Sequence, residues 1–256
     1  MRVVLVTGAD RLSGLAARRL LAEGHRFEVV AVVRTAAPLM RVWSLARTAA
    51  RNRSLYYFFY MAAEAMLPPV TRPCVKAPSI LQHARRHGLP IMQTTNVNDP
   101  EVAGFIGRAT PDVVLSLRPG QIFRMPFISQ VPPILNLHCT RLPKYRGMGG
   151  ILQALAAGDK GLGISVHGVM SEAVDAGPLF AQSMVSDLPE TSLFFQTCRL
   201  YEAAADVIVA GLEAWEAGRT IEYDEADATL HSWPGPAPRN ALSRRDRPFI
   251  SWSDLR

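Results

Sequence analysis

Residues 3–33 read VVLVTGADRLSGLAARRLLAEGHRFEVVAVV, and the spacing of apolar residues changes twice within them. Residues 3–6 are a continuous apolar run that ends at Thr7 and Gly8, residues 12–24 carry apolar side chains at helical spacing, and residues 27–33 are a second apolar run. A short apolar run bounded by turn residues is typical of a buried strand. We therefore predict a strand, a helix and a second strand, which together form one βαβ unit.

The same alternation continues along most of the chain. It predicts helices at 80–87, 101–109, 149–157 and 192–215, and strands at 89–92, 112–117, 134–138 and 161–169. Strands that alternate with helices favour a mostly parallel, doubly wound α/β sheet of the Rossmann-like type, whose ligands bind beyond the carboxyl ends of the strands. Residues 1–220 are predicted to form this domain. Residues 221–256, in which prolines interrupt any periodicity, are predicted to be an irregular C-terminal extension.

The composition is typical of a globular protein. The 256 residues are 48% hydrophobic and 20% charged, which is enough apolar material for a sizeable core. The N-terminal apolar run is too short for a secretory or membrane-spanning segment, so a cytoplasmic location is expected. The three cysteines, Cys74, Cys139 and Cys198, lack CxxC spacing. Neither a disulfide framework nor a metal site is therefore expected.

A basic and aromatic segment covers residues 38–67. Its arginines lead into the run LYYFFY at 55–60, and the chain as a whole has a net charge of +6. Such a helix can lie on a membrane surface or bind a nucleic acid. The favoured interpretation is one long surface helix, ended by Pro68 and Pro69, whose aromatic rings are at least half buried against the body or in a homodimer.

Asn136 and His138 stand two positions apart in the strand predicted at 134–138. Side chains at i and i+2 of a strand project to the same face, so these two point together while Leu137 points to the opposite layer. Downstream, GISVHGVMSEAVDAGPLFAQ at 163–182 places His167 at a strand end and Asp175 in an Asp-Ala-Gly-Pro loop. A lone Asn or His here is as readily a turn residue or one satisfied by the backbone. The pair, followed by the unusual turn LPKYRG, indicates a site.

The ordered motifs NLH at 136–138, LPKYRG at 142–147, GISVH at 163–167 and VDAGPL at 174–179 resemble those of the N10-formyltetrahydrofolate-dependent formyltransferases. That family includes glycinamide ribonucleotide, amino-sugar and methionyl-tRNA formyltransferases. Weaker similarity extends to residues 88–101 and 111–117. The resemblance implies the formyltransferase fold and one-carbon transfer from N10-formyltetrahydrofolate to a primary amine of a small metabolite. An amine of a sugar nucleotide is the leading expectation for the acceptor.

The resemblance also implies roles for individual residues. Asn136, His138 and Asp175 would be catalytic, because formyl transfer needs donors for a developing oxyanion and a relay for protons. Formyltetrahydrofolate is expected to lie against Leu117, Arg118, Gly120, Ile122 and Leu142. The acceptor is expected to contact Gly8, Tyr145, Arg146, Gly147 and His167. No metal takes part in this scheme.

The chain departs from the family pattern in three ways. Gly150 and Gln153 stand where relatives often carry Pro and Trp, and the separation of His167 and Asp175 is eight residues, one longer than the family pattern leads us to expect. The chain also lacks the length for the C-terminal β-barrel domain of the methionyl-tRNA enzymes. A tRNA acceptor, or any other nucleic-acid partner, is therefore not expected, and the positive charge suits the diphosphate of a sugar nucleotide instead.

Three other activities remain open. TGADRLSG at 7–14 looks like the nucleotide turn of a nicotinamide-dependent oxidoreductase, but G-x-G-x-x-G is not matched and Arg34 stands where an acidic residue is needed. In a formyltransferase the same turn would hold a phosphate of the acceptor or simply join strand to helix. A formyltetrahydrofolate hydrolase would use the same three catalytic residues. A non-catalytic domain that binds a folate or a partner protein would need none of them.

Overall fold

One seven-stranded sheet forms the centre of the computed structural model, which describes residues 1–8, 10–22, 24–66 and 77–255. The order across the sheet is β3-β2-β1-β4-β5-β7-β8. Neighbours from β3 to β5 pair in parallel, whereas β7 runs antiparallel to both β5 and β8. The mostly parallel α/β class is thus confirmed, with an antiparallel edge. The strands are β1 (Arg2–Thr7), β2 (Glu28–Thr35), β3 (Ile91–Thr94), β4 (Val113–Leu117), β5 (Ile134–His138), β7 (Gly161–Val169) and β8 (Leu179–Ser186).

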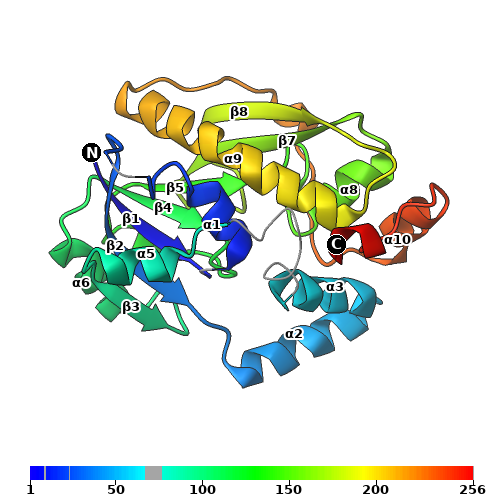
Figure 1. Ribbon diagram of the computed structural model, residues 1–256, viewed down its shortest axis with the longest axis horizontal. Helices are drawn as coiled ribbons and strands as arrows, with labels where there is room; N and C mark the ends of the chain where they lie inside the picture. Colours follow the sequence, from blue (N-terminus) through cyan, green and yellow to red (C-terminus); the bar gives the residue numbers. More distant parts are fainter. Residues whose placement is uncertain (9, 23, 67–76, 256) are drawn as a thin grey trace.

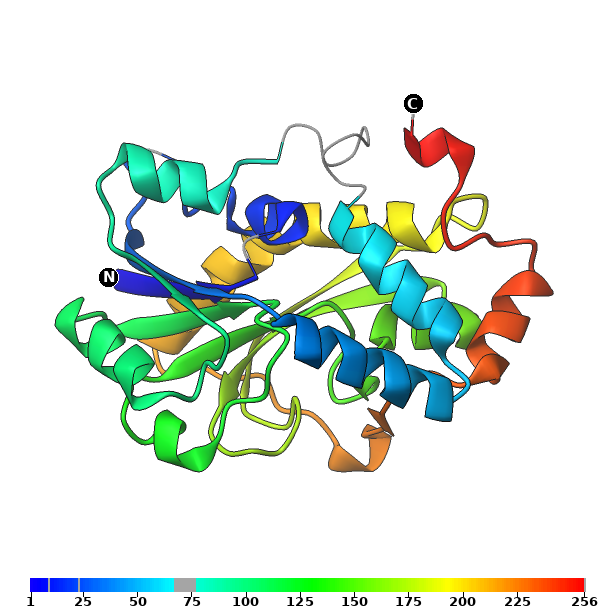
Figure 2. The same ribbon diagram turned by 90° about the horizontal axis from the view of Figure 1, so that it is seen from below.

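Helices cover both faces of the sheet (Figures 1 and 2). On one face lie α1 (Arg11–Ala17), α5 (Ile80–Arg86), α8 (Gly150–Ala157) and the long α9 (Leu193–Glu216). On the other lie α6 (Pro100–Arg108) and α7 (Met125–Ile128). Because β1 and β4 are covered on both sides, they are apolar almost throughout, as the sequence pattern predicts.

The parallel strands β1, β4 and β5 end at the same edge of the sheet, at Thr7, Leu117 and His138. Cross-strand pairing sets Ser116 beside Asn136, and Asn136 beside His167. Ligands of doubly wound sheets bind at this edge. The polar residues singled out in the sequence are therefore gathered where a site is expected.

The basic and aromatic segment forms two helices, α2 (Leu39–Arg51) and α3 (Leu55–Met66), so the expectation of one helix is wrong. The chain turns between them at Arg53, which has a positive φ, and the Ser54 hydroxyl donates to the carbonyl of Pro234. Both helices lie beyond the sheet edge, with α3 near the C-terminal segment (Figures 1 and 2). Tyr60 is buried as predicted, but Phe59 is 64% exposed. The expected stop at Pro68 and Pro69 lies outside the described residues.

The C-terminal segment, residues 221–255, has more regular structure than expected. It contains η2 (Glu225–Asp227), β9 (Leu230–His231), α10 (Pro236–Ser243) and η3 (Trp252–Leu255). The short strand β9 pairs in parallel with β6 (Arg146–Gly147), which lies in the loop after β5. This segment is therefore joined by backbone hydrogen bonds to the loop that carries the LPKYRG motif.

Two expectations from the sequence, no disulfide framework and no membrane span, can be compared with the structure for the described residues. Cys139 is a buried free thiol, Cys198 is also buried, and Cys74 lies outside the described residues. Within the described part of the chain, no helix combines the length and the apolar character that a membrane span requires.

Candidate active site

Asn136 and His138 lie at the carboxyl end of β5 and are partly buried. Leu137 between them is 5% exposed and packs in the core on the opposite side. The alternation of a strand thus brings an amide and an imidazole to the same edge, as predicted from their spacing.

Asp175 lies between two imidazoles. Its Oδ2 is 3.4 Å from Nδ1 of His138, and its Oδ1 is 3.4 Å from Nε2 of His167. The backbone N–H of Gly147 also donates to Oδ2 at 2.9 Å. Asp175 has a φ of 50°, a left-handed conformation that Asp tolerates better than most residues. With one residue more than the spacing we expected after His167, the loop still brings the carboxylate to His138.

The carboxyl group of Asp175 is held ionised. Burial alone would raise its pKa, but the positive charge of His138, the hydrogen bond and charge of His167 and the Gly147 N–H outweigh burial and lower the pKa well below the ordinary value. The carboxylate is therefore an acceptor for a proton on Nδ1 of His138, and for one on Nε2 of His167 only in the charged form of that imidazole.

Asn136 is oriented by two partners. Its Oδ1 accepts a hydrogen bond from the Ser116 hydroxyl at 2.7 Å. In this orientation the Nδ2 atom of the amide faces His167. Nδ2 lies 3.1 Å from Nε2 of His167, whose Nδ1 faces the carbonyl of Gly168 at 3.0 Å. A proton on Nδ1 of His167 satisfies both contacts, with Nε2 accepting from the amide. One N–H of Asn136 then remains for a substrate.

His138 touches the LPKYRG loop through its second nitrogen. Nε2 lies 3.0 Å from the carbonyl of Tyr145, while Nδ1 faces Asp175. A proton on either nitrogen thus has an oxygen acceptor. The loop is fixed from outside by the C-terminal segment, because Thr229 accepts from the amides of both Tyr145 and Arg146 at 2.9 Å.

The five residues expected to contact the acceptor are spread over different environments. Gly147 holds Asp175, and His167 is a buried partner of Asn136 and Asp175. Tyr145 is buried with its hydroxyl on Asp159, and the guanidinium of Arg146 pairs with Glu225. The N–H of Gly8 donates to the carbonyl of Arg118 at 3.2 Å. The structure brings Gly147 and His167 into the proposed catalytic cluster. It turns the side chains of Tyr145 and Arg146 toward other parts of the protein.

The residues expected to hold the folate are also divided. Leu117 is a core residue of β4, Gly120 has a positive φ, and Ile122 is 49% exposed. Leu142 is buried and, with Arg141 and Gln182, borders a separate cavity beside the C-terminal segment. Arg118 points away from this group into a buried ionic cluster with Asp10 and Glu64.

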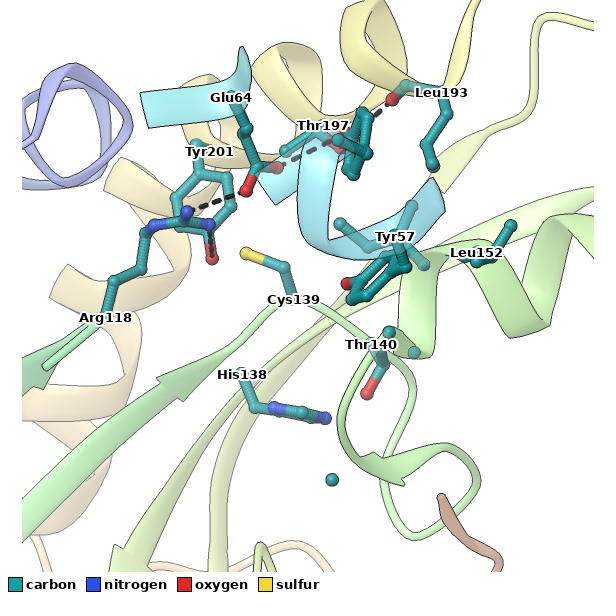
Figure 3. Close-up of a pocket in the computed structure, with 15 residues that line it drawn as sticks. Tyr57, Glu64, Arg118, His138, Cys139, Thr140, Leu152, Leu193, Thr197 and Tyr201 are labelled. Atoms are coloured by element: carbon teal, nitrogen blue, oxygen red, sulfur yellow. Dashed lines mark hydrogen bonds and ion pairs between the residues drawn. The ribbon is translucent and has the colours of Figure 1, made fainter. Parts of the chain in front are cut away.

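A cavity of about 180 Å³ opens beside His138 (Figure 3). Its walls come from α3, α8, α9 and the turn after β4, and His138 lies at one end. Three of the lining residues were not predicted from the sequence: Tyr57, Glu64 and Tyr201. Periodicity places them only on amphipathic helices, and no local pattern brings α3 over the end of β5. The lining residues are Tyr57, Tyr60, Glu64, Arg118, His138, Cys139, Thr140, Gly147, Gly149, Gly150, Ile151, Leu152, Leu193, Thr197 and Tyr201.

Residues 2–211 match the family model described as formyl transferase. The chain belongs to this family. Among its relatives is the methionyl-tRNA formyltransferase of Roseiflexus castenholzii, 29% identical over 190 residues that are 69% of this chain and 59% of the relative. The methionyl-tRNA formyltransferase of Thermotoga neapolitana is 32% identical over 172 residues, 66% of this chain and 52% of the relative. The chain thus spans little more than half the length of these relatives.

Solved structures share the formyltransferase fold. The phosphoribosylglycinamide formyltransferase from Bacillus halodurans superposes with a TM-score of 0.59 and 18% identity, covering 84% of this chain and 95% of that one. A formyltetrahydrofolate deformylase from Pseudomonas syringae gives a TM-score of 0.56 and 20% identity, covering 87% of this chain and 63% of that one. The resemblance inferred from the motifs at 136–179 is thereby confirmed at the level of family and fold.

Proposed function

We propose that this protein transfers a formyl group from N10-formyltetrahydrofolate to a primary amine of a small metabolite. The observation that carries the proposal is the position of Asp175 within 3.4 Å of both His138 and His167, next to the amide of Asn136. Membership of the formyl transferase family supports the same reaction class. The described residues contain no group of His, Cys, Asp and Glu that could hold a metal ion, and the proposed chemistry requires none.

Asn136, His138 and Asp175 would share the chemistry. When a neutral amine attacks the formyl carbon, negative charge develops on the formyl oxygen, and donors already in place stabilise it. Asn136 offers the free N–H of an amide whose orientation Ser116 fixes. The attacking nitrogen must lose a proton and the leaving N10 must gain one. His138 beside the ionised Asp175 is an acid/base pair suited to both transfers.

The folate would lie on the side of the site away from α3. Ile122 and Met170 are exposed apolar side chains on the loops after β4 and β7, and the pair Arg124–Glu172 joins these two loops. A flat pteridine ring needs apolar contacts with a few backbone partners, which such loops supply. Gly120 and Ile122 remain our candidates for this contact, whereas the side chain of Arg118 is directed elsewhere.

For the acceptor we propose a chemical class, a primary amine of a small metabolite, and no particular compound. The relatives named above act, by their names, on methionyl-tRNA and on phosphoribosylglycinamide. A sugar-nucleotide amine, our expectation from the sequence, would need a place for its diphosphate. The turn at Gly8 offers little for that purpose, because its N–H is bonded to Arg118 and the carboxylate of Asp10 occupies the start of α1. A phosphate would have to lie outside this turn.

The first test is whether the protein binds the proposed formyl donor. A 5-deazafolate analogue should bind in calorimetry, and a panel of sugar amines and other small amines should gain the mass of a formyl group in the presence of formyltetrahydrofolate. Asn136→Ala, His138→Ala and Asp175→Ala should each lower turnover by about 100-fold or more with an unchanged circular dichroism spectrum. Near wild-type turnover of His138→Ala would refute the assignment. Formate released at the same rate with and without amines would identify a hydrolase instead.

A further inference from the structure

Helix α3 contributes three side chains to the cavity beside His138, although it lies in a segment to which the proposed catalysis assigns no role. Tyr57, Tyr60 and Glu64 stand three and four residues apart, so they share one face of the helix and line the cavity together. Figure 3 shows Glu64 above Cys139, with His138 on the other side of Cys139. The cavity thus extends from the proposed reaction centre to α3.

Glu64 belongs to a buried cluster of charges. Its Oε2 pairs with Arg118 at 2.8 Å, and Arg118 also pairs with Asp10 at 2.9 Å. Tyr60 donates to Oε1 of Glu64 at 3.3 Å, and Arg118 donates to the Tyr201 hydroxyl at 3.2 Å. One guanidinium between two carboxylates leaves the cluster with an excess of one negative charge. Its positive member is fully engaged, so an anion entering this end of the cavity would meet repulsion without a free cationic partner.

Tyr57 supplies a polar group that the protein itself does not use. Its ring lies against Tyr60 and Trp233, and its hydroxyl reaches the cavity wall near Gly149. Within the described parts of the chain, no group hydrogen-bonds this hydroxyl. Burial raises the pKa of Tyr57 well above its usual value, so the hydroxyl stays a neutral donor and acceptor. A half-buried hydroxyl that faces a cavity is a ready contact for a ligand.

We propose that α3 is the acceptor-specificity wall of this enzyme. The cavity takes the non-reacting part of an amine that is uncharged or cationic there, with Glu64 and Tyr57 as its hydrogen-bond partners, and rejects carboxylated or phosphorylated groups. This inference rests on the proposed formyl transfer, because it assigns the cavity to the acceptor. It also makes Glu64 and Tyr57 specificity-determining residues of this enzyme.

Three five-carbon amines that differ only in the far group test the proposal: 1,5-diaminopentane, pentylamine and 5-aminopentanoate. Binding of each is measured by calorimetry without folate, and formylation of each is measured separately by mass. We expect 5-aminopentanoate to bind about tenfold more weakly than 1,5-diaminopentane. In Glu64→Gln, which keeps the shape of the side chain, this difference should shrink to about twofold. Phe59→Ala, an exposed position on the same helix, should leave it unchanged.

The outcomes separate the inference from the function on which it rests. Equal affinities for the three probes, tighter binding of 5-aminopentanoate, or no binding of any probe would overturn the inference. An unchanged preference of Glu64→Gln for 1,5-diaminopentane over 5-aminopentanoate would also overturn the inference, since Glu64 would then not interact with the far group. Binding in the expected order without formylation of any amine supports the cavity's charge preference and contradicts formyl transfer.

Discussion

The carbonyl oxygen of Thr229 accepts a hydrogen bond from the amide of Arg146 at 2.9 Å. The Thr229 hydroxyl accepts a second one from the amide of Tyr145, whose carbonyl contacts Nε2 of His138 at 3.0 Å. A residue of the C-terminal segment therefore positions the backbone that touches the proposed catalytic histidine.

Thr229→Val should lower turnover more than it changes substrate binding. The substitution keeps the shape of the side chain but leaves the Tyr145 N–H without its side-chain acceptor, at a cost of about 1 kcal/mol in the free energy of unfolding, since Thr229 is exposed. The Tyr145 carbonyl should then shift relative to His138, so we expect kcat to fall and KM to change little. Thr191→Val, which removes an exposed hydroxyl that bonds to the Leu188 carbonyl, is the matched control. Equal turnover in both variants would show that the contact does not position His138.

Asp175→Asn should destabilise the protein at neutral pH and progressively less in acid. The pKa of Asp175 is lower in the folded protein than its ordinary value of 3.8, so this carboxylate contributes stability above that value. The contribution declines as the pH falls from 3.8 toward the folded-state pKa, because the unfolded chain then binds the proton first. Urea titrations of both proteins at several pH values between 7 and 3 measure the difference. Asp246→Asn, at an exposed position, controls for the lost charge. A pH-independent difference would contradict the prediction.

Arg118→Met should cost about 3 kcal/mol in the free energy of unfolding, because it leaves the carboxylates of Asp10 and Glu64 without their shared cation. Adding Glu64→Gln should recover part of this loss, since one of the stranded charges is then removed. Arg19→Met breaks the exposed pair with Asp206 and should cost less than about 1 kcal/mol. Denaturant unfolding of five proteins gives the comparison: wild type, Arg118→Met, Glu64→Gln, the double variant and Arg19→Met. Strictly additive effects of the Arg118 and Glu64 changes would rule out coupling.

Cys139 should resist alkylation although it lines the cavity next to His138. Burial raises the pKa of its thiol to about 12, so almost no thiolate exists at pH 8. Peptide mapping after treatment with iodoacetamide should find Cys139 unmodified in the folded protein and modified in urea. Rapid modification of Cys139 in the folded protein would mean that the cavity is more open than the structure indicates.

Strong local patterns predicted most of the sheet and the edge that carries the proposed catalytic residues. The strands at 134–138 and 161–169 have the bounds predicted. The predicted helix at 12–24 ends at Ala17 instead, although its apolar spacing continues beyond that residue. β8 was missed, since only two of its eight residues are buried and its second half is partly buried or exposed, which leaves a weak apolar pattern.

The candidate site was predictable only where its residues share a motif. Asn136, His138 and Asp175 were found through the family resemblance, and the chain brings them together. The contact between Glu64 and Arg118 joins residues far apart in the sequence, so neither periodicity nor spacing predicts it. Thr229 was missed because the two-residue strand that follows it lies in a proline-rich segment and leaves almost no pattern in the sequence.

Helix α3 and the proposed catalytic residues come from different parts of the chain. The side chains proposed for the chemistry come from β5 and the loop after β7, whereas α2 and α3 enter after β2 and contribute no strand to the sheet. Replacing α3 would therefore alter the far wall of the cavity while the framework that orients Asn136 and His138 stays intact. Under the proposal above, substitutions on the cavity face of α3 that keep the Glu64–Arg118 pair and the buried Tyr60 would change which amines fit, while the supports of Asn136 and His138 are unaltered.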